Sequence, residues 1–582
     1  FGGLFDTVDG GFSRYSVDLK WHVPHFEKML YDNGQLVSLY ADAYKLTQNS
    51  LYKEVIEKTL QFISRELINN ENGFYCALDA DSLDDKGHLE EGAFYVWNKT
   101  DLEKIITEDF ELFSQVFNIN EFGYWENSNY VLIQNQELEI IAKRNDLKLS
   151  ELQIKKRNWE KLLFTEREER SKPRLDDKSL TSWNAIMLKG YIDAYKALGN
   201  ENYLEIALKN AHFIIEKLWT PEGNLLHNYK NGTSTINGYL EDYCFVIDAF
   251  ISLYEVTIDE KWLRISKQLT DYCFDHFYDD NAHFFSFTSK NDAPLIATHF
   301  ETEDNVIPAS NSVMANNLFQ LSISFQNQYY ESICMKMLKK IIPNIDYPSA
   351  YSNWLNVLMN YSEEQKELGI CGENALEYLS KINREYHPNL IIAGANRISE
   401  LPFLKDRVIE NEMLFYVCQN QTCQLPTSNF DEVKKMTIEK DIKYYPNSVD
   451  PSFYNYSLNN QIDVEEEQKN DGKFNVVFAG NVGIGQGIEV ILEAAKILSD
   501  IDNIQFVIYG SGSRLEWLEE QKKQYNLKGI ILKGRHPVES MPQLLSNANA
   551  LLVTLSDEPI FAKTIPNKIQ AYLAVGRPIL AC

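Results

Sequence analysis

A recurring pair of amphipathic helices constrains the fold of this 582-residue chain more than any other sequence feature. The pattern occurs at residues 39–57, 190–207 and 251–266, and more weakly at 318–342. In each copy, apolar residues recur at i, i+3, i+4 and i+7, and a short link predicts an antiparallel helical hairpin. Because one hairpin cannot bury its apolar face alone, repeated hairpins must stack or close into a ring. We therefore predict an αα-toroid over residues 1–436.

The C-terminal part, residues 437–582, has a different pattern. Apolar runs at 474–479, 504–509 and 550–555 predict strands, and amphipathic segments between them predict helices. Strands that alternate with helices are typical of βαβ units and a parallel sheet. The polar segment 465–472 indicates a surface loop or linker. The predicted fold class is therefore α followed by α/β, a toroid and then a Rossmann-like half-domain.

Composition excludes several classes of protein. Acidic residues outnumber basic ones by 84 to 56, and this net charge of −28 disfavours nucleic-acid and anionic-membrane binding. No apolar run reaches about 18 residues, so no transmembrane segment is predicted. Of eight cysteines only Cys418 and Cys423 lie close together, which is no disulfide framework and fits a reducing, cytoplasmic location. We interpret these two cysteines as structural.

Polar and aromatic side chains gather where the first helix of each hairpin is predicted to begin, at one rim of the toroid. Sugar rings stack on Trp and Tyr faces, and carboxylates bind hydroxyls or transfer protons, so the cluster suits a carbohydrate. Ser, Asn and Asp at these positions are also ordinary helix caps, and acidic residues there favour the helix dipole, so a structural role stays open for each. No His/Cys/Asp set has metal-ligand spacing, and we predict no metal.

Several motifs of the first part are recognisable. Residues 9–18 (DGGFSRYSVD) and 21–33 (WHVPHFEKMLYDN) closely resemble the YyaL-like, spermatogenesis-associated thioredoxin-domain family. Residues 176–185, 305–312 and 423–426 fit the same family. The resemblance covers about residues 1–430 and implies an (α/α)6 barrel of the six-hairpin glycosidase type, similar to N-acylglucosamine 2-epimerases. Members also carry a thioredoxin-like domain that is missing here. Because no Cys-x-x-Cys is present, a redox function is not supported.

The resemblance implies the site residues by analogy of fold. For acid–base catalysis we expect His25, Glu27, Asp177 and Asp242. For sugar binding we expect Asp32, Trp183, Asn184, Tyr243 and Asn311.

The C-terminal motifs resemble family 4 glycosyltransferases of the GT-B fold, of the capsular-polysaccharide (colanic acid-type) branch. They are residues 445–450 (YPNSVD), 480–487 (GNVGIGQG), 510–512 (GSG), 533–535 (KGR) and 565–578 (IPNKIQAYLAVGRP). Glycine-rich turns between a strand and a helix let backbone N–H groups approach a phosphate. The resemblance implies nucleotide-sugar binding, with the diphosphate held by Gly483, Gly485 and Lys568 and the base framed near Lys533.

The same segment departs from the broad glycosyltransferase pattern. The paired glutamates of that family would fall at Lys563 and Ala571, and its phosphate-binding lysine at Gln486. The acceptor-binding half of GT-B is absent, and the chain ends at Cys582 directly after an apolar run. We expect that this part alone does not transfer sugar, and we treat the chain as a fragment.

The leading prediction is a carbohydrate-related protein: a sugar-processing barrel of the epimerase or glycosidase type joined to a nucleotide-sugar-binding glycosyltransferase part. The expected ligands are a small carbohydrate and a nucleotide-sugar donor, with no other cofactor and no nucleic acid. One alternative is a non-enzymatic binding or scaffold module. Another is a chimeric gene model, since the two resemblances meet near residues 436–437 and each partner lacks its other half.

Overall fold

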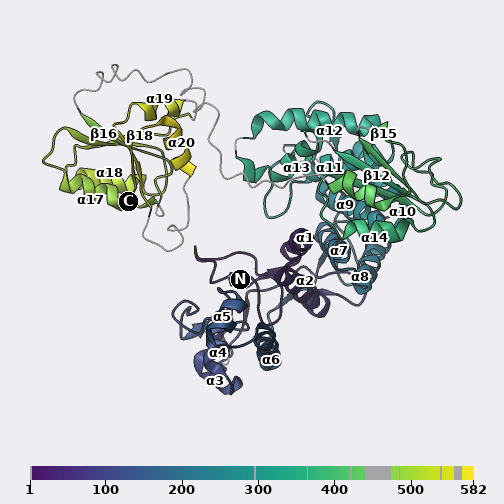
Figure 1. Ribbon diagram of the computed structural model, residues 1–582, viewed down its shortest axis with the longest axis horizontal. Coiled ribbons are helices and arrows are strands. Elements are labelled where there is room, and N and C mark those ends of the chain that lie inside the picture. Colours follow the sequence, from purple (N-terminus) through teal and green to yellow (C-terminus); the bar gives the residue numbers. More distant parts are fainter. Residues whose placement is uncertain are drawn as a thin grey trace. The chain divides into compact units, whose positions relative to one another are not determined.

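The computed structural model describes residues 3–84, 86–293, 297–345, 347–362, 365–419, 422–438, 473–483, 486–537, 540–555 and 567–581. The chain divides into two compact units, Phe1–Glu439 and Lys440–Cys582 (Figure 1). Each unit is described by itself.

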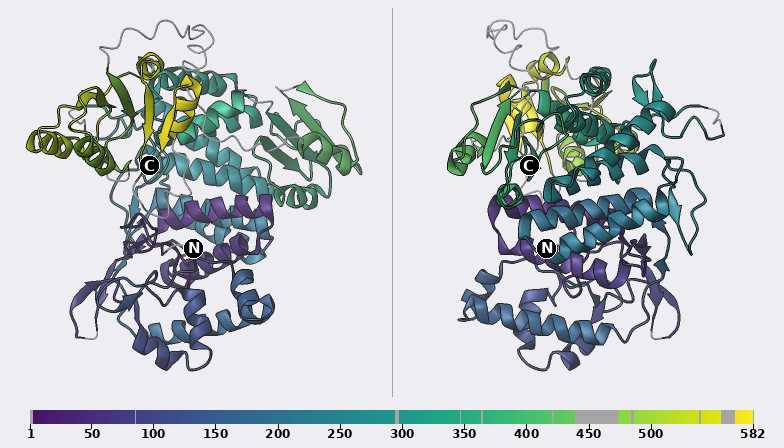
Figure 2. Two further views of the ribbon diagram at one scale, coloured as in Figure 1. Left: turned by 60° about the vertical axis from the view of Figure 1, so that its left-hand side comes forward. Right: turned by 90° about the vertical axis from the view of Figure 1, so that its right-hand side faces the viewer.

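Antiparallel helical hairpins with links of two or three residues form the main body of the first unit (Figure 2). The first helices of the hairpins pack on one another in chain order and line a cavity of about 590 Å³. The second helices lie outside them, which is the arrangement of an (α/α)6 barrel, so the predicted helical architecture is confirmed. The inner helices are α1 (Leu30–Thr47), α7 (Thr181–Leu198), α9 (Leu240–Thr257), α11 (Ser310–Ser324) and α13 (Ser352–Ser362), and the outer ones are α2 (Ser50–Phe62), α8 (Glu201–Phe213), α10 (Lys261–His276) and α12 (Gln328–Ile341).

A buried asparagine ties an inner helix to the loop that follows the preceding outer helix. In α7, the Asn184 Oδ1 accepts a hydrogen bond from the Phe74 N–H at 2.7 Å, and its Nδ2 donates to the Phe74 carbonyl at 3.0 Å. In α1, Asn33 holds Phe12 in the same way, at 2.8 and 3.1 Å. The side-chain amide thus replaces a peptide group of a neighbouring strand. We call each such pair of bonds an amide clamp.

Two more of the inner helices, α9 and α11, have related contacts. Asn311 of α11 exchanges two bonds of 2.9 Å with the backbone of Phe285. In α9 a tyrosine takes this place, since the Tyr243 hydroxyl accepts from the Leu225 N–H at 2.9 Å. All four side chains are fully buried. The clamps therefore fix where each of these inner helices begins relative to its neighbour.

Two parts of this unit were not predicted from the sequence. Four helices between the first two hairpins enclose a separate small core: α3 (Lys99–Ile105), α4 (Phe110–Phe117), α5 (Leu138–Arg144) and α6 (Leu149–Arg167). A four-stranded sheet of order β13-β12-β14-β15 follows α13. It is built from β12 (Lys366–Cys371), β13 (Leu390–Ala395), β14 (Leu414–Gln419) and β15 (Thr422–Cys423), with α14 (Ala375–Asn383) and α15 (Phe430–Ile438). Cys418 and Cys423 form a disulfide across its last hairpin, a bond that the sequence analysis did not predict.

The second unit is a five-stranded parallel sheet of order β18-β17-β16-β19-β20, which confirms the predicted Rossmann-like topology. The bounds of its elements are β16 (Phe474–Ala479), α17 (Ile488–Ile497), β17 (Ile504–Tyr509), α18 (Leu515–Gln524), β18 (Ile530–Gly534), α19 (Met541–Ser546), β19 (Ala550–Val553), α20 (Asn567–Val575) and β20 (Ile579–Ala581). Helices cover both faces of the sheet, and a separate apolar core fills each side.

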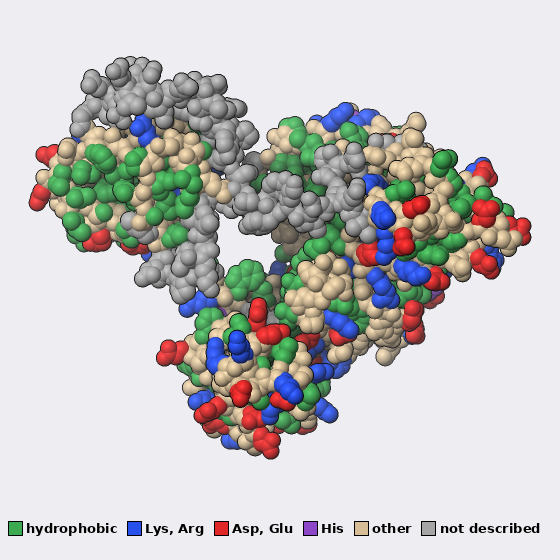
Figure 3. All heavy atoms as spheres, viewed as in Figure 1, with side chains coloured by type: hydrophobic (Ala, Val, Ile, Leu, Met, Phe, Trp, Pro, Cys, Tyr) green, Lys and Arg blue, Asp and Glu red, His purple; other side chains and the backbone are tan. Residues whose placement is uncertain are grey.

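The surface of the helical unit carries charges of both signs. On the face shown in Figure 3, acidic and basic side chains alternate over short distances. Many of them are paired, as Lys209 is with Glu205 at 2.7 Å and Lys381 is with Glu377 at 2.7 Å. Among the described residues, no helix is both long and apolar enough to cross a membrane.

The amide clamps predict a specific loss of stability. Asn184→Ala leaves the buried N–H and C=O of Phe74 without their partners, so the free energy of unfolding should fall by about 2–4 kcal/mol. Urea unfolding measured by circular dichroism tests this. The exposed Asn202→Ala is the matched control and should change the stability by less than about 0.5 kcal/mol. Equal effects of the two substitutions would contradict the clamp.

Candidate functional site

The first turns of α1, α7 and α9 meet at one end of the helical unit. The rings of Tyr31 in α1 and Trp183 in α7 lie edge to face, with centroids 4.7 Å apart. The Ser182 N–H donates to Asp242 Oδ1 at 2.9 Å, and the Ser182 hydroxyl donates to Glu241 Oε1 at 3.1 Å. We call the set Tyr31, Asp32, Trp183, His227, Glu241 and Asp242 the rim site.

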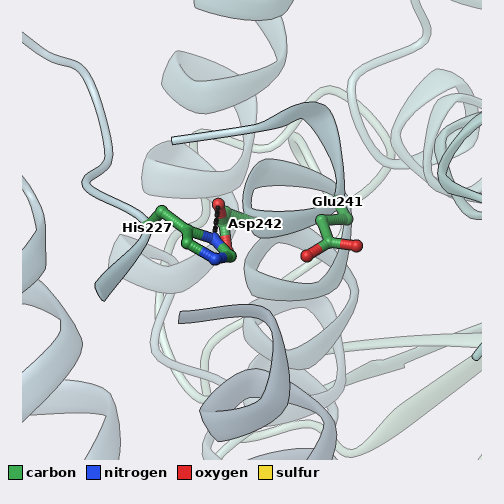
Figure 4. Close-up of side chains that lie close together, drawn as sticks. All are labelled: His227, Glu241 and Asp242. Atoms are coloured by element: carbon green, nitrogen blue, oxygen red, sulfur yellow. Dashed lines mark hydrogen bonds and ion pairs between the residues drawn. The ribbon is translucent and has the colours of Figure 1, made fainter. Parts of the chain in front are cut away.

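His227, Glu241 and Asp242 form its charged centre, shown in Figure 4. His227 precedes β9 (Asn228–Tyr229), and its Nδ1 lies 2.9 Å from Asp242 Oδ2. Asp242 is fully buried and also accepts hydrogen bonds from the N–H groups of Ser182 and Tyr239. Burial acts to lower the pKa of His227, but the hydrogen bond and charge of Asp242 outweigh it and raise that pKa. Asp242 therefore orients the imidazole and favours its protonated form.

Glu241 is a carboxyl group kept partly protonated at neutral pH. Burial raises its pKa from the ordinary 4.5 to about 7, and the nearby Asp242 and Glu301 carboxylates act in the same direction. The hydroxyl of Ser182, the described donor to this carboxylate, opposes the shift only in part. A carboxylic acid in this state can give a proton near pH 7.

Asp32, in the first turn of α1, is a second carboxyl group of the same kind. Burial raises its pKa to about 7, the Arg14 guanidinium opposes this, and the Glu27 carboxylate adds to it. Among the described residues, the buried Oδ2 of Asp32 has no hydrogen-bond partner. An unpaired buried carboxylate oxygen is costly, so it is best explained by a group that binds there or by the proton that it holds.

Three of the residues expected from sequence for acid–base work lie beside the rim site. His25 Nδ1 lies 2.8 Å from Glu91 Oε1, and its Nε2 lies 3.9 Å from Glu27 Oε2. Glu27 and Asp177 line a common cavity of about 430 Å³. Asp177 is half-buried, and its hydrogen bond and ion pair with Lys230 lower its pKa. Since Asp177 is ionised and paired at neutral pH, it is a poor proton donor.

Three of the residues expected to bind sugar are buried and form hydrogen bonds within the protein core instead. All the hydrogen-bonding positions of the Asn184 side chain are used, by Phe74, Leu180 and Asn210. Asn311 and Tyr243 are likewise fully buried in clamp contacts. We therefore leave these three residues out of the candidate site.

The site residues expected from the sequence did not include His227 or Glu241. Glu241 adjoins Asp242 in the printed sequence, but nothing in the spacing says which of two successive acids is buried against Ser182. His227 lies in a loop before the next inner helix, so no periodicity connects it with the rim. His227 reaches the rim site through the pairing of β9 with β8 (Ser179–Leu180), and Glu241 reaches it through the packing of α9 against α7.

A metal ion is the alternative occupant of the rim site. His227, Glu241 and Asp242 each offer one ligand atom, and these atoms lie within 4.8 Å of one another in the described structure. Both oxygens of Asp242 already accept hydrogen bonds, however, and a cation would have to displace the His227–Asp242 bond. The arrangement therefore favours proton chemistry over metal binding.

In the second unit, Lys568 lies beside the glycine-rich segment that follows β16. Its Nζ donates to Gln486 Oε1 at 2.5 Å and lies 3.9 Å from the centre of the Phe478 ring. Burial lowers the pKa of Lys568 to about 8. Gly483 is buried in the same segment, whereas the Lys533 side chain is exposed on β18. Gly485, also expected to bind the diphosphate, lies outside the described residues.

Two different protein families match separate parts of the chain. Residues 148–305 match the catalytic domain of the β-L-arabinofuranosidases of family GH127, and residues 459–580 match the glycosyl transferases of group 1. Human spermatogenesis-associated protein 20 is 30% identical over 477 residues, covering 75% of this chain and 61% of the relative. The putative colanic acid biosynthesis glycosyl transferase WcaI of Escherichia coli K12 is 26% identical over 146 residues, covering 25% of this chain and 35% of that protein.

The chain thus spans about three fifths of the length of its spermatogenesis-associated relatives and about a third of WcaI. A sugar epimerase from a ruminal bacterium aligns with a TM-score of 0.37 and 12% identity, over 58% of this chain and 66% of that one. Both family resemblances predicted from the sequence motifs are confirmed. The chain joins a carbohydrate-related six-hairpin barrel part to a glycosyl transferase group 1 domain.

The raised pKa of Glu241 predicts a pH-dependent cost in stability. The folded state holds this proton up to about pH 7 and the unfolded chain releases it near 4.5, so stability decreases as pH rises through that window. Glu241→Gln removes the cost and should stabilise the protein by about 2–3 kcal/mol at pH 8, with little effect at pH 4.5.

Urea unfolding of both proteins at the two pH values measures this difference. The exposed Glu216→Gln serves as the control and should show no dependence of this kind. If Glu241→Gln instead destabilises the protein equally at both pH values, ionisation of Glu241 does not lower the free energy of unfolding, and the prediction is wrong.

Proposed function

We propose that the helical unit hydrolyses a glycosidic bond at the rim site by general acid–base catalysis. The observation that carries this proposal is the pair Asp32 and Glu241, two largely buried carboxyl groups with pKa values near 7 at the starts of α1 and α9, the two barrel helices that pack on either side of α7. Glycoside hydrolysis needs one carboxyl group that gives a proton and one that acts as a base or nucleophile. The match of residues 148–305 to a glycosidase catalytic domain supports the same reaction class.

Each residue of the rim site has a role in this proposal. Glu241 is the general acid, because its neutral form persists at pH 7 and Ser182 orients its carboxyl group. Asp32, whose Oδ2 has no described partner, is the base or nucleophile in its ionised form. His227, whose protonated form is favoured by Asp242, is the group that supplies positive charge beside the reacting oxygen. The half-buried Trp183 ring, packed edge to face on the buried Tyr31, provides an apolar face for a sugar ring.

The test is turnover of aryl glycosides, beginning with p-nitrophenyl α- and β-L-arabinofuranosides and followed by a panel of neutral pyranosides. Glu241→Gln should lower kcat by about 10²–10⁴-fold, because it removes the general acid. In the unmodified protein, kcat/KM should fall as pH rises above 7, where Glu241 loses its proton. Glu205→Gln, which changes an exposed ion pair on the outer helix α8, is the matched control and should retain kcat.

A binding module without catalysis is the competing function. It predicts sugar-dependent thermal shifts that Trp183→Ala abolishes, with no turnover of any glycoside. Turnover that survives Glu241→Gln unchanged would contradict the assignment of the acid.

We further propose that the second unit binds the diphosphate of a nucleotide-sugar between the segment after β16 and Lys568. Lys568 is a buried ammonium group whose described polar partner is a neutral amide, so an anionic ligand would supply its missing counter-charge. The match of residues 459–580 to group 1 glycosyl transferases supports a nucleotide-sugar as that ligand.

This proposal predicts that nucleotide binding depends on Lys568. Lys568→Met should weaken UDP binding by at least about tenfold, since a charge-assisted bond to phosphate is lost. Isothermal titration calorimetry on the full chain measures it, with the exposed Lys528→Met as the control. Affinity should also fall as pH rises above 8, where free Lys568 becomes neutral. Equal affinity of the two variants would contradict the proposed site.

A further inference from the structure

The disulfide between Cys418 and Cys423 joins two residues that lie directly opposite each other in an antiparallel hairpin. Cys418 belongs to β14 and Cys423 to β15, the outermost strand of the four-stranded sheet. Cys418 is 1% exposed, whereas Cys423 is half-buried. The two sulfur atoms of one bond therefore differ in their access to solvent.

This bond contributes little to holding the fold. The cysteines are five positions apart, and the stabilisation from closing a loop decreases as the loop becomes shorter. The hairpin is also held by its own backbone pairing, including the bond from the Gln424 N–H to the Val417 carbonyl at 3.0 Å. The sheet can therefore persist when the disulfide is reduced.

Cys418 is placed as the leaving group of an exchange reaction. Arg407 Nη1 donates to Cys418 Sγ at 3.4 Å. The guanidinium lies over the rings of Phe403 and Tyr416, at 4.7 and 5.1 Å from their centres, which fixes its position. A cation beside a sulfur stabilises the thiolate, and a thiol of lower pKa leaves faster.

A buried carboxyl residue is paired with Cys418 in the sheet. Glu367 of β12 pairs directly with Cys418 in the sheet register and is 3% exposed. Side chains of directly opposed residues lie on one face of a sheet, with Cβ atoms about 5 Å apart. An ionised Glu367 opposes the thiolate that Arg407 favours, so the two neighbours have opposite effects on the exchange rate.

The other cysteines of the described chain are protected. Cys76, Cys244, Cys273, Cys334 and Cys371 are all buried. Burial raises the pKa of each of their thiols, to about 12 for Cys76, Cys334 and Cys371. Thiol chemistry in the described part of this chain is therefore concentrated at the Cys418–Cys423 pair.

We propose that Cys418–Cys423 is a thiol–disulfide exchange site for a dithiol reductant. One thiolate of the reductant attacks Cys423 Sγ, the S–S bond breaks, and Cys418 leaves as a thiolate beside Arg407. The second thiolate of the reductant then attacks the mixed disulfide and releases Cys423. Two electrons pass to the protein, the reductant becomes a disulfide, and the two released thiolates take up protons according to their pKa. This site is independent of the rim site and of its proposed reaction.

The test uses dithiothreitol as the dithiol on the native full chain. Free thiols are then alkylated with iodoacetamide, and each cysteine is quantified by mass spectrometry of its own peptide. Cys418 and Cys423 should become alkylated under native conditions while the five buried cysteines stay unmodified until denaturant is added. Reduction of the pair that requires denaturant would overturn the proposal.

Substitutions of Arg407 and Glu367 test whether each residue speeds or slows reduction of the disulfide. Arg407→Met should slow native reduction by about tenfold, and Glu367→Gln should accelerate it, because one removes the stabilising charge and the other the opposing one. Arg407→Lys, which keeps the charge, should restore most of the rate. Circular dichroism and protection of the five buried cysteines verify that each variant is folded. If folded Arg407→Met and Glu367→Gln both reduce at the unmodified rate, the proposed leaving-group assignment is wrong.

Discussion

The amide clamps are the interaction on which the rest of the helical unit depends. An isolated helical hairpin has no fixed position along its neighbour, because apolar side chains pack with little directional preference. A buried carboxamide differs, since its donors and acceptor must all be satisfied in one geometry. Asn33, Asn184 and Asn311 each satisfy them on the backbone of the loop before the helix, which sets the start of each inner helix.

The convergence of the rim site follows from this constraint. Trp183 and Asn184 are neighbours in α7, so the clamp that fixes Asn184 also fixes the ring that meets Tyr31. Tyr243 does the same for Glu241 and Asp242 at the start of α9. The clamped helix starts hold the Asp32 and Glu241 carboxyl groups in poorly solvated positions, and this burial raises the pKa of each.

Periodic features of this fold could be predicted from the sequence, and features that depend on burial could not. The hairpins and the parallel sheet repeat at fixed spacings, so they were predicted correctly. Asn184 and Asn311 stand at helix starts among polar residues, where an amide in the core and an amide facing a ligand look alike in sequence. His227 reaches Asp242 from a loop of an earlier hairpin, and only tertiary packing brings the two together. The sheet β12–β15 was missed because its short strands lie within a region whose pattern is mainly helical.

The strand order of the second unit has a consequence for where any ligand of that unit lies. From β16 the chain proceeds through β17 to β18 on one side, and then returns past β16 to β19 and β20 on the other. In open α/β sheets the loops diverge where the direction of winding reverses, and the crevice at this topological switch point receives the ligand. The segment after β16 lies at that point, and the Thr554 hydroxyl beyond β19 donates to the Gln486 carbonyl across it. The place where a ligand can approach this sheet is thus a property of how the chain is wound, whereas side chains such as Gln486 decide which chemical groups meet that ligand.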